Sequence, residues 1–273
     1  MFRLLSGTEP ESSSGHLQEP LSLRDELRFS GLGLHHHMPT DFLRSQWQRG
    51  PKSSIFLVYR WLLGGFFGTG VVSCIYQYYQ HGNFFIFLTN WGFVLCGITS
   101  IAGAILVTIY HYKPESWVPP SCWIKIYWAC YWINISLACL IAVVYWTAIY
   151  PKDRVITNPT RVSDLFNIWT HLLPPIFFTI DNFLVAQPAR LLHFVYPLAF
   201  LHLYGIFAII FYARGGRNLD GKHYIYPFLN FAKPKIVLRT VSWLSIMLVS
   251  LSSLQYGVYR LRNFIARKLG KLL

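Results

Sequence analysis

The segment NIWTHLLPPIFFTID, from Asn167 to Asp181, carries an Asn, a His, an Asp and two prolines inside an apolar region of the chain. Six residues recur here at spacings of three or four and so share one face of a helix: Asp164, Asn167, His171, Pro174, Phe178 and Asp181. An ionisable group near the centre of a bilayer costs roughly 2.5–3.5 kcal/mol, so it usually faces a cavity or a partner. We therefore expect this polar stripe to face inward, where His171 could act as a general base.

A histidine base needs a nucleophile within hydrogen-bonding reach, and Thr89 is the strongest candidate. Thr89 lies near the start of a predicted span that enters the membrane from the same side as the span of His171, so the two are expected at similar depth. Asn167, one turn before His171, can orient the imidazole. Asp181 lies about 15 Å further along the helix and cannot. We expect Asp181 to pair with Arg190 near the same interface instead.

A structural interpretation of these residues stays open. His171 and Asn167 could simply bond across helices, while the two adjacent prolines kink the span. Asn167, Asp181 and His202 are secondary candidates for contact with a substrate or with the catalytic pair. His202 and His193 could line the same cavity, but a single His on an apolar helix is usually structural.

The composition indicates which elements must position these side chains. Of the 273 residues, 53% are hydrophobic and 18% aromatic, and only 13% are charged, which is unlike a soluble single-core domain. Apolar runs near the roughly 20 residues that cross a bilayer recur from about Ser54 onward. We predict an all-α polytopic membrane bundle of about six transmembrane helices, over 54–77, 85–109, 123–149, 162–186, 190–212 and 236–259.

Three regions are expected along the chain. Residues 1–50 mix Ser, Gly, Pro and charges of both signs and predict a flexible N-terminal tail, followed by the transmembrane domain over 51–260. Residues 261–273 predict a basic amphipathic C-terminal tail at the membrane interface, although a solvated tail fits almost equally well. An even number of spans puts both termini on one side, and the nearby Lys and Arg favour the cytosol.

Charge and cysteine usage indicate the partners. A net charge of +13 suggests nucleic acid in a soluble protein, but here the Lys and Arg cluster at span ends, so we expect membrane lipid and no nucleic acid. The five cysteines lack metal-binding spacing, and the adjacent His35, His36 and His37 do not form an organised site. We therefore predict no metal and no cofactor, in a protein of the plasma membrane or the endoplasmic reticulum.

Several stretches of the sequence are similar to a known family. They are SQWQ with YRW before and in the first span, DLFNIWTHLLPPIFFTIDNFL in the fourth, and YPFLNF closing the last long loop. With these stretches in this order, the chain after the tail resembles the rolling stone family of multi-pass membrane proteins. The resemblance implies a role in myoblast fusion during muscle formation, with a second copy of the chain or a fusion-machinery protein as partner.

A more distant resemblance is to the androgen-induced transmembrane threonine hydrolases, which cleave fatty acid esters of hydroxy fatty acids. Their pattern of F-L-T and of N-x-x-x-H before a proline fits Thr89 and the stretch from Asn167 to His171. It implies Thr89 as nucleophile and His171 as general base. Two features depart from that pattern: Pro174 follows His171 after only three residues, and the basic loop ARGGRNLDGKHY is not part of it. A fusion protein and a lipid ester hydrolase therefore both remain open, and a transporter ranks last.

Overall fold

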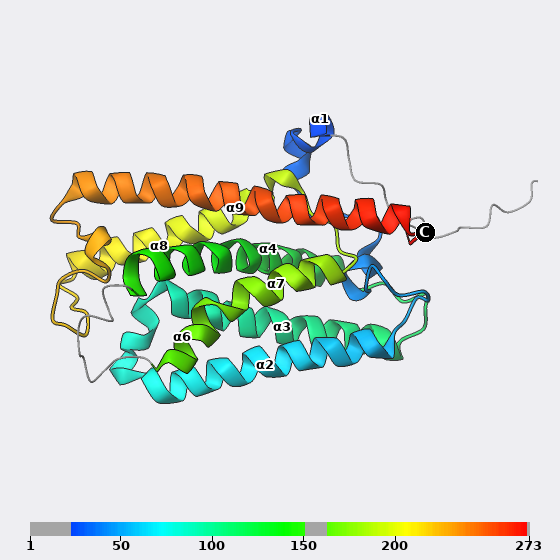
Figure 1. Cartoon of the computed structure of the whole chain (residues 1–273), viewed down its shortest axis with the longest axis horizontal. Coiled ribbons are helices and arrows are strands. Elements are labelled where there is room, and N and C mark those ends of the chain that lie inside the picture. Colours follow the sequence, from blue (N-terminus) through cyan, green and yellow to red (C-terminus); the bar gives the residue numbers. More distant parts are fainter. Residues whose placement is uncertain (1–22, 151–162, 272–273) are drawn as a thin grey trace, which may run out of the picture.

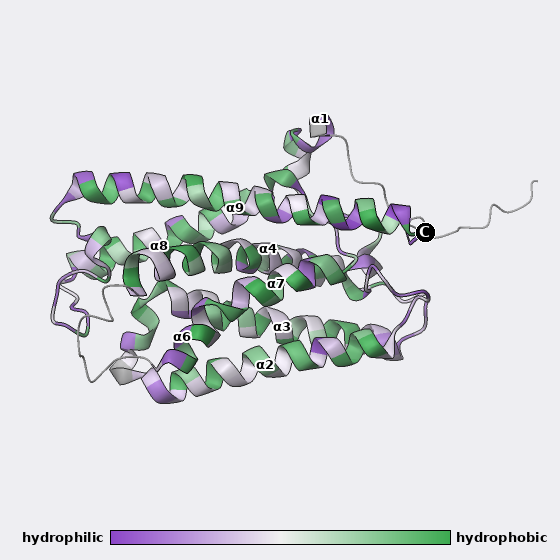
Figure 2. Cartoon of the chain, viewed as in Figure 1, coloured by the Kyte–Doolittle hydropathy of each residue, from purple (hydrophilic) through white to green (hydrophobic). Residues whose placement is uncertain are grey.

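The protein folds as an all-α bundle, as predicted. The computed structural model describes residues 23–150 and 163–271, which contain no strand beyond a single bridge between Ser45 and Val185. The long helices run along one common axis and lie side by side (Figure 1). Hydrophobic residues dominate the helices, and hydrophilic residues are commonest at the two ends of the bundle (Figure 2). This distribution is typical of a membrane protein.

Five helices of the described residues are long and apolar enough to cross a membrane. They are α2 (Ser54–Tyr78), α3 (Leu88–Tyr112), α4 (Ser121–Val144) continued by the π-helix η4 (Tyr145–Ile149), α8 (Val195–Ala213) preceded by η5 (Leu191–Phe194), and α9 (Pro234–Lys268). Shorter elements are α1 (Leu23–Glu26), η1 (Phe29–Leu32), η2 (Pro39–Leu43), η3 (Gln80–Ile86) and η6 (Pro227–Leu229).

The fourth predicted span is divided in two. Helix α6 (Asp164–His171) ends before Leu172, and α7 (Leu173–Leu184) follows it end to end (Figure 1). Pro174 and Pro175 explain the break, because proline lacks the N–H that would bond back to the preceding turn but fits the first turn of a new helix. Together the pair is about 31 Å long, which matches a bilayer core. The kink expected from the two prolines is confirmed.

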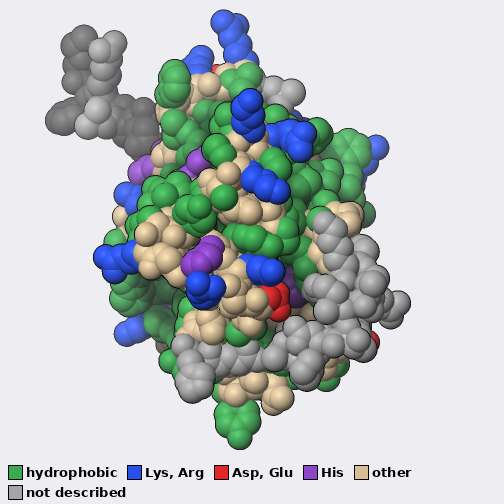
Figure 3. Space-filling view, turned by 90° about the vertical axis from the view of Figure 1, so that its left-hand side faces the viewer, with side chains coloured by type: hydrophobic (Ala, Val, Ile, Leu, Met, Phe, Trp, Pro, Cys, Tyr) green, Lys and Arg blue, Asp and Glu red, His purple; other side chains and the backbone are tan. Residues whose placement is uncertain are grey.

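The bundle has two distinct ends. At the end that we call the terminal end, the backbone N–H of Gln46 donates to Leu184 O at 2.9 Å, and the Gln46 side chain donates to Lys271 O at 3.4 Å. The segment that precedes α2 and the chain that follows α9 therefore meet there. The opposite end, the loop end, holds the connection 214–233, and Lys and Arg side chains spread over it with few acidic ones (Figure 3).

The N-terminal tail region contributes to the core where it is described. Phe42 and Leu43 are buried, and the Phe42 ring packs edge-on against Trp128 with centroids 5.0 Å apart. The second half of the segment assigned to a flexible tail is therefore packed onto the bundle, because its apolar residues find a site beside α4. Residues 1–22 lie outside the described part of the chain.

Close approach of α2 and α3 depends on glycine. A Cβ added to Gly64 would lie 3.3 Å from the carbonyl oxygen of Ser100, and one added to Gly68 would lie 3.1 Å from the Ile101 side chain. The small pair at four-residue spacing in the first span thus packs against a neighbouring helix, as its spacing predicts. At the far end of α9, the apolar Leu261, Phe264 and Leu269 point outward.

Candidate functional site

The polar stripe of α6 and α7 faces the inside of the bundle. Asn167, His171, Phe178 and Asp181 are all buried, and of the stripe only Asp164, in the first turn of α6, is exposed. On the opposite side of the segment, Leu172 and Ile176 are 38% and 44% exposed. The inward orientation predicted from helical spacing is confirmed.

Asp181 is part of a buried ion pair with α2. Nη1 of Arg60 donates to both carboxylate oxygens at 3.1 Å, and the hydroxyl of Tyr59 donates to Oδ1 at 2.8 Å. The expected pair with Arg190 is wrong, because the Arg190 guanidinium turns to the N-terminal region and donates to His35 O at 2.7 Å. Asp181 therefore joins α7 to α2 and does not reach a cavity.

The next residue along α7 joins it to α9. The Asn182 amide donates to Gln255 O at 3.0 Å, and the Gln255 amide donates to Thr179 Oγ1 at 2.8 Å. The buried Arg262 donates to the carbonyl oxygens of Asn182 and Gln187, both at 2.9 Å. Asn182 O lies in the last turn of α7, where a carbonyl oxygen has no N–H partner in its own helix, so the bond from Arg262 satisfies it. This network lies toward the terminal end of the bundle.

His171 is held in one tautomer by its own helix. Its Nδ1 lies 3.1 Å from Asn167 O and 2.8 Å from Thr170 Oγ1. The Thr170 hydroxyl already donates to Phe166 O at 2.7 Å, so toward His171 it can only accept, as the carbonyl does. Nδ1 therefore carries the proton, and Nε2 is the basic nitrogen. The contact from Asn167 comes from its backbone carbonyl oxygen, which any residue at this position would supply, so the role predicted for the Asn167 side chain stays a prediction.

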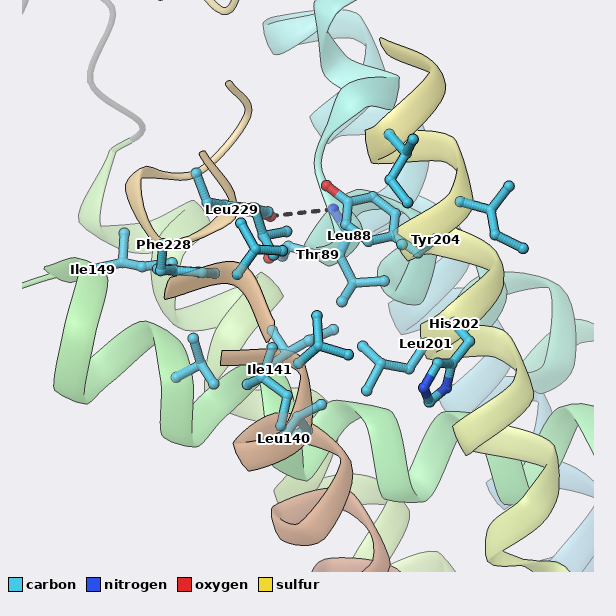
Figure 4. Close-up of a pocket in the computed structure, with 18 of the residues that line it drawn as sticks. Leu88, Thr89, Leu140, Ile141, Ile149, Leu201, His202, Tyr204, Phe228 and Leu229 are labelled. Atoms are coloured by element: carbon cyan, nitrogen blue, oxygen red, sulfur yellow. Dashed lines mark hydrogen bonds between the residues drawn. The ribbon is translucent and has the colours of Figure 1, made fainter. Parts of the chain in front are cut away.

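Thr89 lines a cavity of about 300 Å³ near the loop end. The cavity lies between the start of α3, the end of α4, helix α8, the loop around η6 and the start of α9 (Figure 4). Its wall is largely apolar, and the side chains in it that carry a polar group are those of Thr89, Tyr145, His202, Tyr204 and Tyr226. The backbone N–H of Leu88 donates to the Tyr226 hydroxyl at 3.2 Å. The nucleophile predicted from the sequence thus faces a largely apolar cavity.

Tyr226 remains a neutral phenol beside Thr89. Burial raises the pKa of Tyr226 to about 12, although hydrogen bonds from Leu88 and Thr89 oppose the rise. At neutral pH the group can therefore donate as well as accept a hydrogen bond.

The predicted catalytic pair is separated by an aromatic ring. Tyr145 stacks on His171 with ring centroids 3.4 Å apart and an interplanar angle of 12°. Tyr145 itself lines the cavity with Thr89 and His202, whereas His171 does not. His171 therefore meets the cavity only from behind the Tyr145 ring, and His202 is the imidazole that shares the cavity with Thr89.

Two other histidines of the described residues lie outside the cavity. His193 is buried against Trp128, with ring centroids 4.6 Å apart, outside the cavity. His36, from the run of three, pairs with Asp41 at 2.8 Å. Among the described residues there is no group of three or more His, Cys, Asp or Glu that could hold a metal ion.

Three side chains that contact or adjoin the predicted site residues were not predicted from the sequence. Arg60 stands alone in an apolar run, Tyr226 lies in a loop, and Tyr145 lies at the start of the π-helix η4. Arg60 meets Asp181, Tyr226 lies beside Thr89, and Tyr145 stacks on His171, because the tertiary fold places each pair at the same depth in the bundle. Two of the three lie in stretches that carried the family resemblance, Arg60 in YRW and Tyr226 in YPFLNF, but the resemblance did not give them a role.

The chain was compared with known proteins. The family described as "Protein rolling stone" matches residues 19–272, which include the whole bundle, the cavity and the polar stripe. "Protein rolling stone" of Drosophila melanogaster is 32% identical over 256 residues, covering 90% of this chain and 92% of the relative. No solved structure matches the chain significantly.

Proposed function

The chain belongs to the rolling stone family of multi-pass membrane proteins, and on this premise we propose that it acts in the fusion of cell membranes during muscle formation. The observation that favours a non-enzymatic role is how the polar stripe is used. Asp181 bonds to Arg60 and Tyr59, and Asn182 bonds to Gln255. These polar groups hold α7 to α2 and α9, so the stripe stabilises the bundle that fusion partners recognise.

The test is rescue of fusion in myoblasts that lack the chain. Wild type and Thr89→Ala are expected to restore multinucleated cells equally, because the role does not require the Thr89 hydroxyl. Asp181→Leu is expected to fail, since it leaves Arg60 buried without its anion. Normal fusion in cells without the chain would refute the proposal, and failure of Thr89→Ala at normal surface expression would favour an enzyme.

A second candidate is an intramembrane hydrolase of lipid esters such as fatty acid esters of hydroxy fatty acids. The observation that favours it is that Thr89 lines an apolar cavity beside the neutral hydroxyl of Tyr226. In this scheme the Thr89 oxygen attacks the ester carbonyl while its proton passes to Nε2 of His171. The proton then moves to the departing alkoxide, and water releases the acid from the acyl-threonine. The Tyr145 ring has to turn aside before His171 can act.

Labelling with a fluorophosphonate probe separates the two candidates. The probe should label wild-type protein in membranes but neither Thr89→Ala nor His171→Ala at matched expression. Thr108→Ala is a suitable control, because Thr108 lies at the far end of α3 and its hydroxyl donates to Ala104 O. Absence of labelling in folded wild-type protein would argue against the hydrolase.

A further inference from the structure

The apolar cavity reaches the outer surface of the bundle along α8. Two of the α8 side chains that line it, Ile206 and Ile209, are 55% and 51% exposed. In a membrane this surface contacts the hydrocarbon of the bilayer. A cavity with an apolar wall holds water poorly, so the acyl chains beside the opening are its natural occupants.

Positive charge surrounds the loop end of the cavity. Arg214 follows α8 directly, and Lys233 directly precedes α9, one turn before the cavity residue Val237. The stretch 214–239 contains six Lys and Arg residues, all exposed, against one acidic residue, Asp220. Figure 3 shows Lys and Arg side chains spread over this end of the molecule. Basic groups near a membrane surface attract anionic lipid headgroups.

One segment forms the wall between the apolar cavity and a more polar hollow. Leu229 and Phe231 line the cavity, while the alternate residues Asn230 and Ala232 line the hollow together with His223. The hollow therefore opens among the basic residues at the loop end. An amphiphile with an acyl chain in the cavity can place its headgroup at this hollow.

We propose that the cavity binds one acyl chain of an anionic phospholipid of the surrounding bilayer, with the headgroup held by the basic residues at the loop end, Arg214 and Lys233 first among them. Binding of this lipid goes beyond the role in fusion and does not require that the lipid be hydrolysed. The lipid would act as a bound component that completes the packing between α8 and the start of α9.

Photocrosslinking of the purified full chain in phosphatidylcholine nanodiscs tests the cavity. The probe is a phosphatidylserine with a diazirine in one acyl chain, and the labelled peptides are identified by mass spectrometry. Gly205 lines the cavity, and a Cβ added there meets no atom within 4 Å, so Gly205→Leu can extend a side chain into the space. We expect labelling of the lining segments of α8 and α9 to fall at least about tenfold in this variant.

A matched glycine controls for folding. Gly65 is exposed on α2 and also has no atom within 4 Å of an added Cβ, so Gly65→Leu makes the same change away from the cavity. Labelling in Gly65→Leu is expected to equal that of wild type. If the label is spread evenly over α2 and α8 and survives Gly205→Leu, the cavity does not bind the acyl chain.

A second pair of variants tests the headgroup. Arg214→Glu with Lys233→Glu should reduce phosphatidylserine labelling to that of a phosphatidylcholine probe with the same acyl chain. Lys113→Glu with Lys125→Glu, exposed at the terminal end, should leave it unchanged. Equal labelling of the wild-type cavity by both probes would refute anionic selectivity. The readout is lipid binding, so its failure is distinct from a failure of the fusion or hydrolase assays.

Discussion

The buried pair of Arg60 and Asp181 allows a sharp test of what holds the bundle together. In Asp181→Asn the side chain keeps its shape, but the carboxylate that accepts two bonds from Arg60 and one from Tyr59 loses its charge. Arg60 is 1% exposed, and among the described residues it forms a salt bridge with Asp181 alone, so its charge would remain buried without an anion. Breaking such a pair costs about 3–5 kcal/mol.

That cost converts to a fall of roughly 6–20 °C in Tm. The free thiols of Cys74 and Cys96 are buried, whereas Cys122 is exposed and Cys130 and Cys139 are half-buried. In a background with Cys122→Ser, Cys130→Ser and Cys139→Ser, a thiol-reactive fluorophore therefore reports unfolding of the detergent-solubilised chain. The double variant Arg60→Met with Asp181→Leu removes both charges and should recover most of the lost stability, since well-packed apolar replacements of buried pairs are often neutral.

The matched control is Asp220→Asn, which makes the same chemical change on an exposed loop residue and should leave Tm within about 1–2 °C of wild type. A Tm for Asp181→Asn equal to that of wild type would refute the reasoning. So would a double variant as unstable as the single one, because the loss would then come from packing and not from the unpaired charge.

Three further predictions concern other contacts. Tyr59→Phe removes one hydrogen bond to the Asp181 carboxylate and should cost about 1.5–3 kcal/mol, measured as a smaller fall in Tm than in Asp181→Asn. Gly64→Leu forces α2 away from the α3 backbone and should lower Tm by the equivalent of about 1–3 kcal/mol, whereas Gly65→Leu in open space should not. Burial raises the pKa of Glu26 above its ordinary value of 4.5, so the folded state binds that proton more tightly and stability should fall as the pH rises above about 4.5. Glu26→Gln should flatten this slope in a series of Tm measurements against pH.

Local patterns predicted the parts of the fold that depend on local physics. Spacing alone placed Asn167, His171 and Asp181 on a buried face, because a helix brings residues three and four apart to one side. The adjacent prolines predicted the break before α7, since the missing N–H groups act at the position where they stand. Neither inference needed a second helix.

Contacts between helices were harder to predict, because they depend on relative depth and rotation. Asp181 could in principle pair with any cation at the same depth in the membrane. The pair predicted with Arg190, which is nearby in sequence, was wrong, and the partner is Arg60, which is distant in sequence. Thr89 and His171 were predicted at similar depth, yet Tyr145 lies against His171 and faces the cavity. Tyr145 begins a π-helix, and such a local change of helical turn rotates side chains in a way that periodicity does not reveal.

The polar network and the cavity occupy different halves of the molecule. Residues that line the cavity can therefore change while the contacts that hold the helices together stay the same. The ion pair of Asp181 and the bonds of Arg262 lie toward the terminal end, around α2, α7 and the second half of α9. The cavity lies at the loop end, against α8 and the start of α9. Within the 18-residue apolar stretch of the span that contains α8, 22% of the residues are buried inside the bundle, compared with 56% for α3. Displacing α8 would therefore expose little of the core. Segments with few buried contacts open at low free energy. The proposed lipid would therefore enter beside α8 while the terminal end stays closed, and substitutions around Thr89 would change the lining of the cavity without weakening the network that holds the helices together.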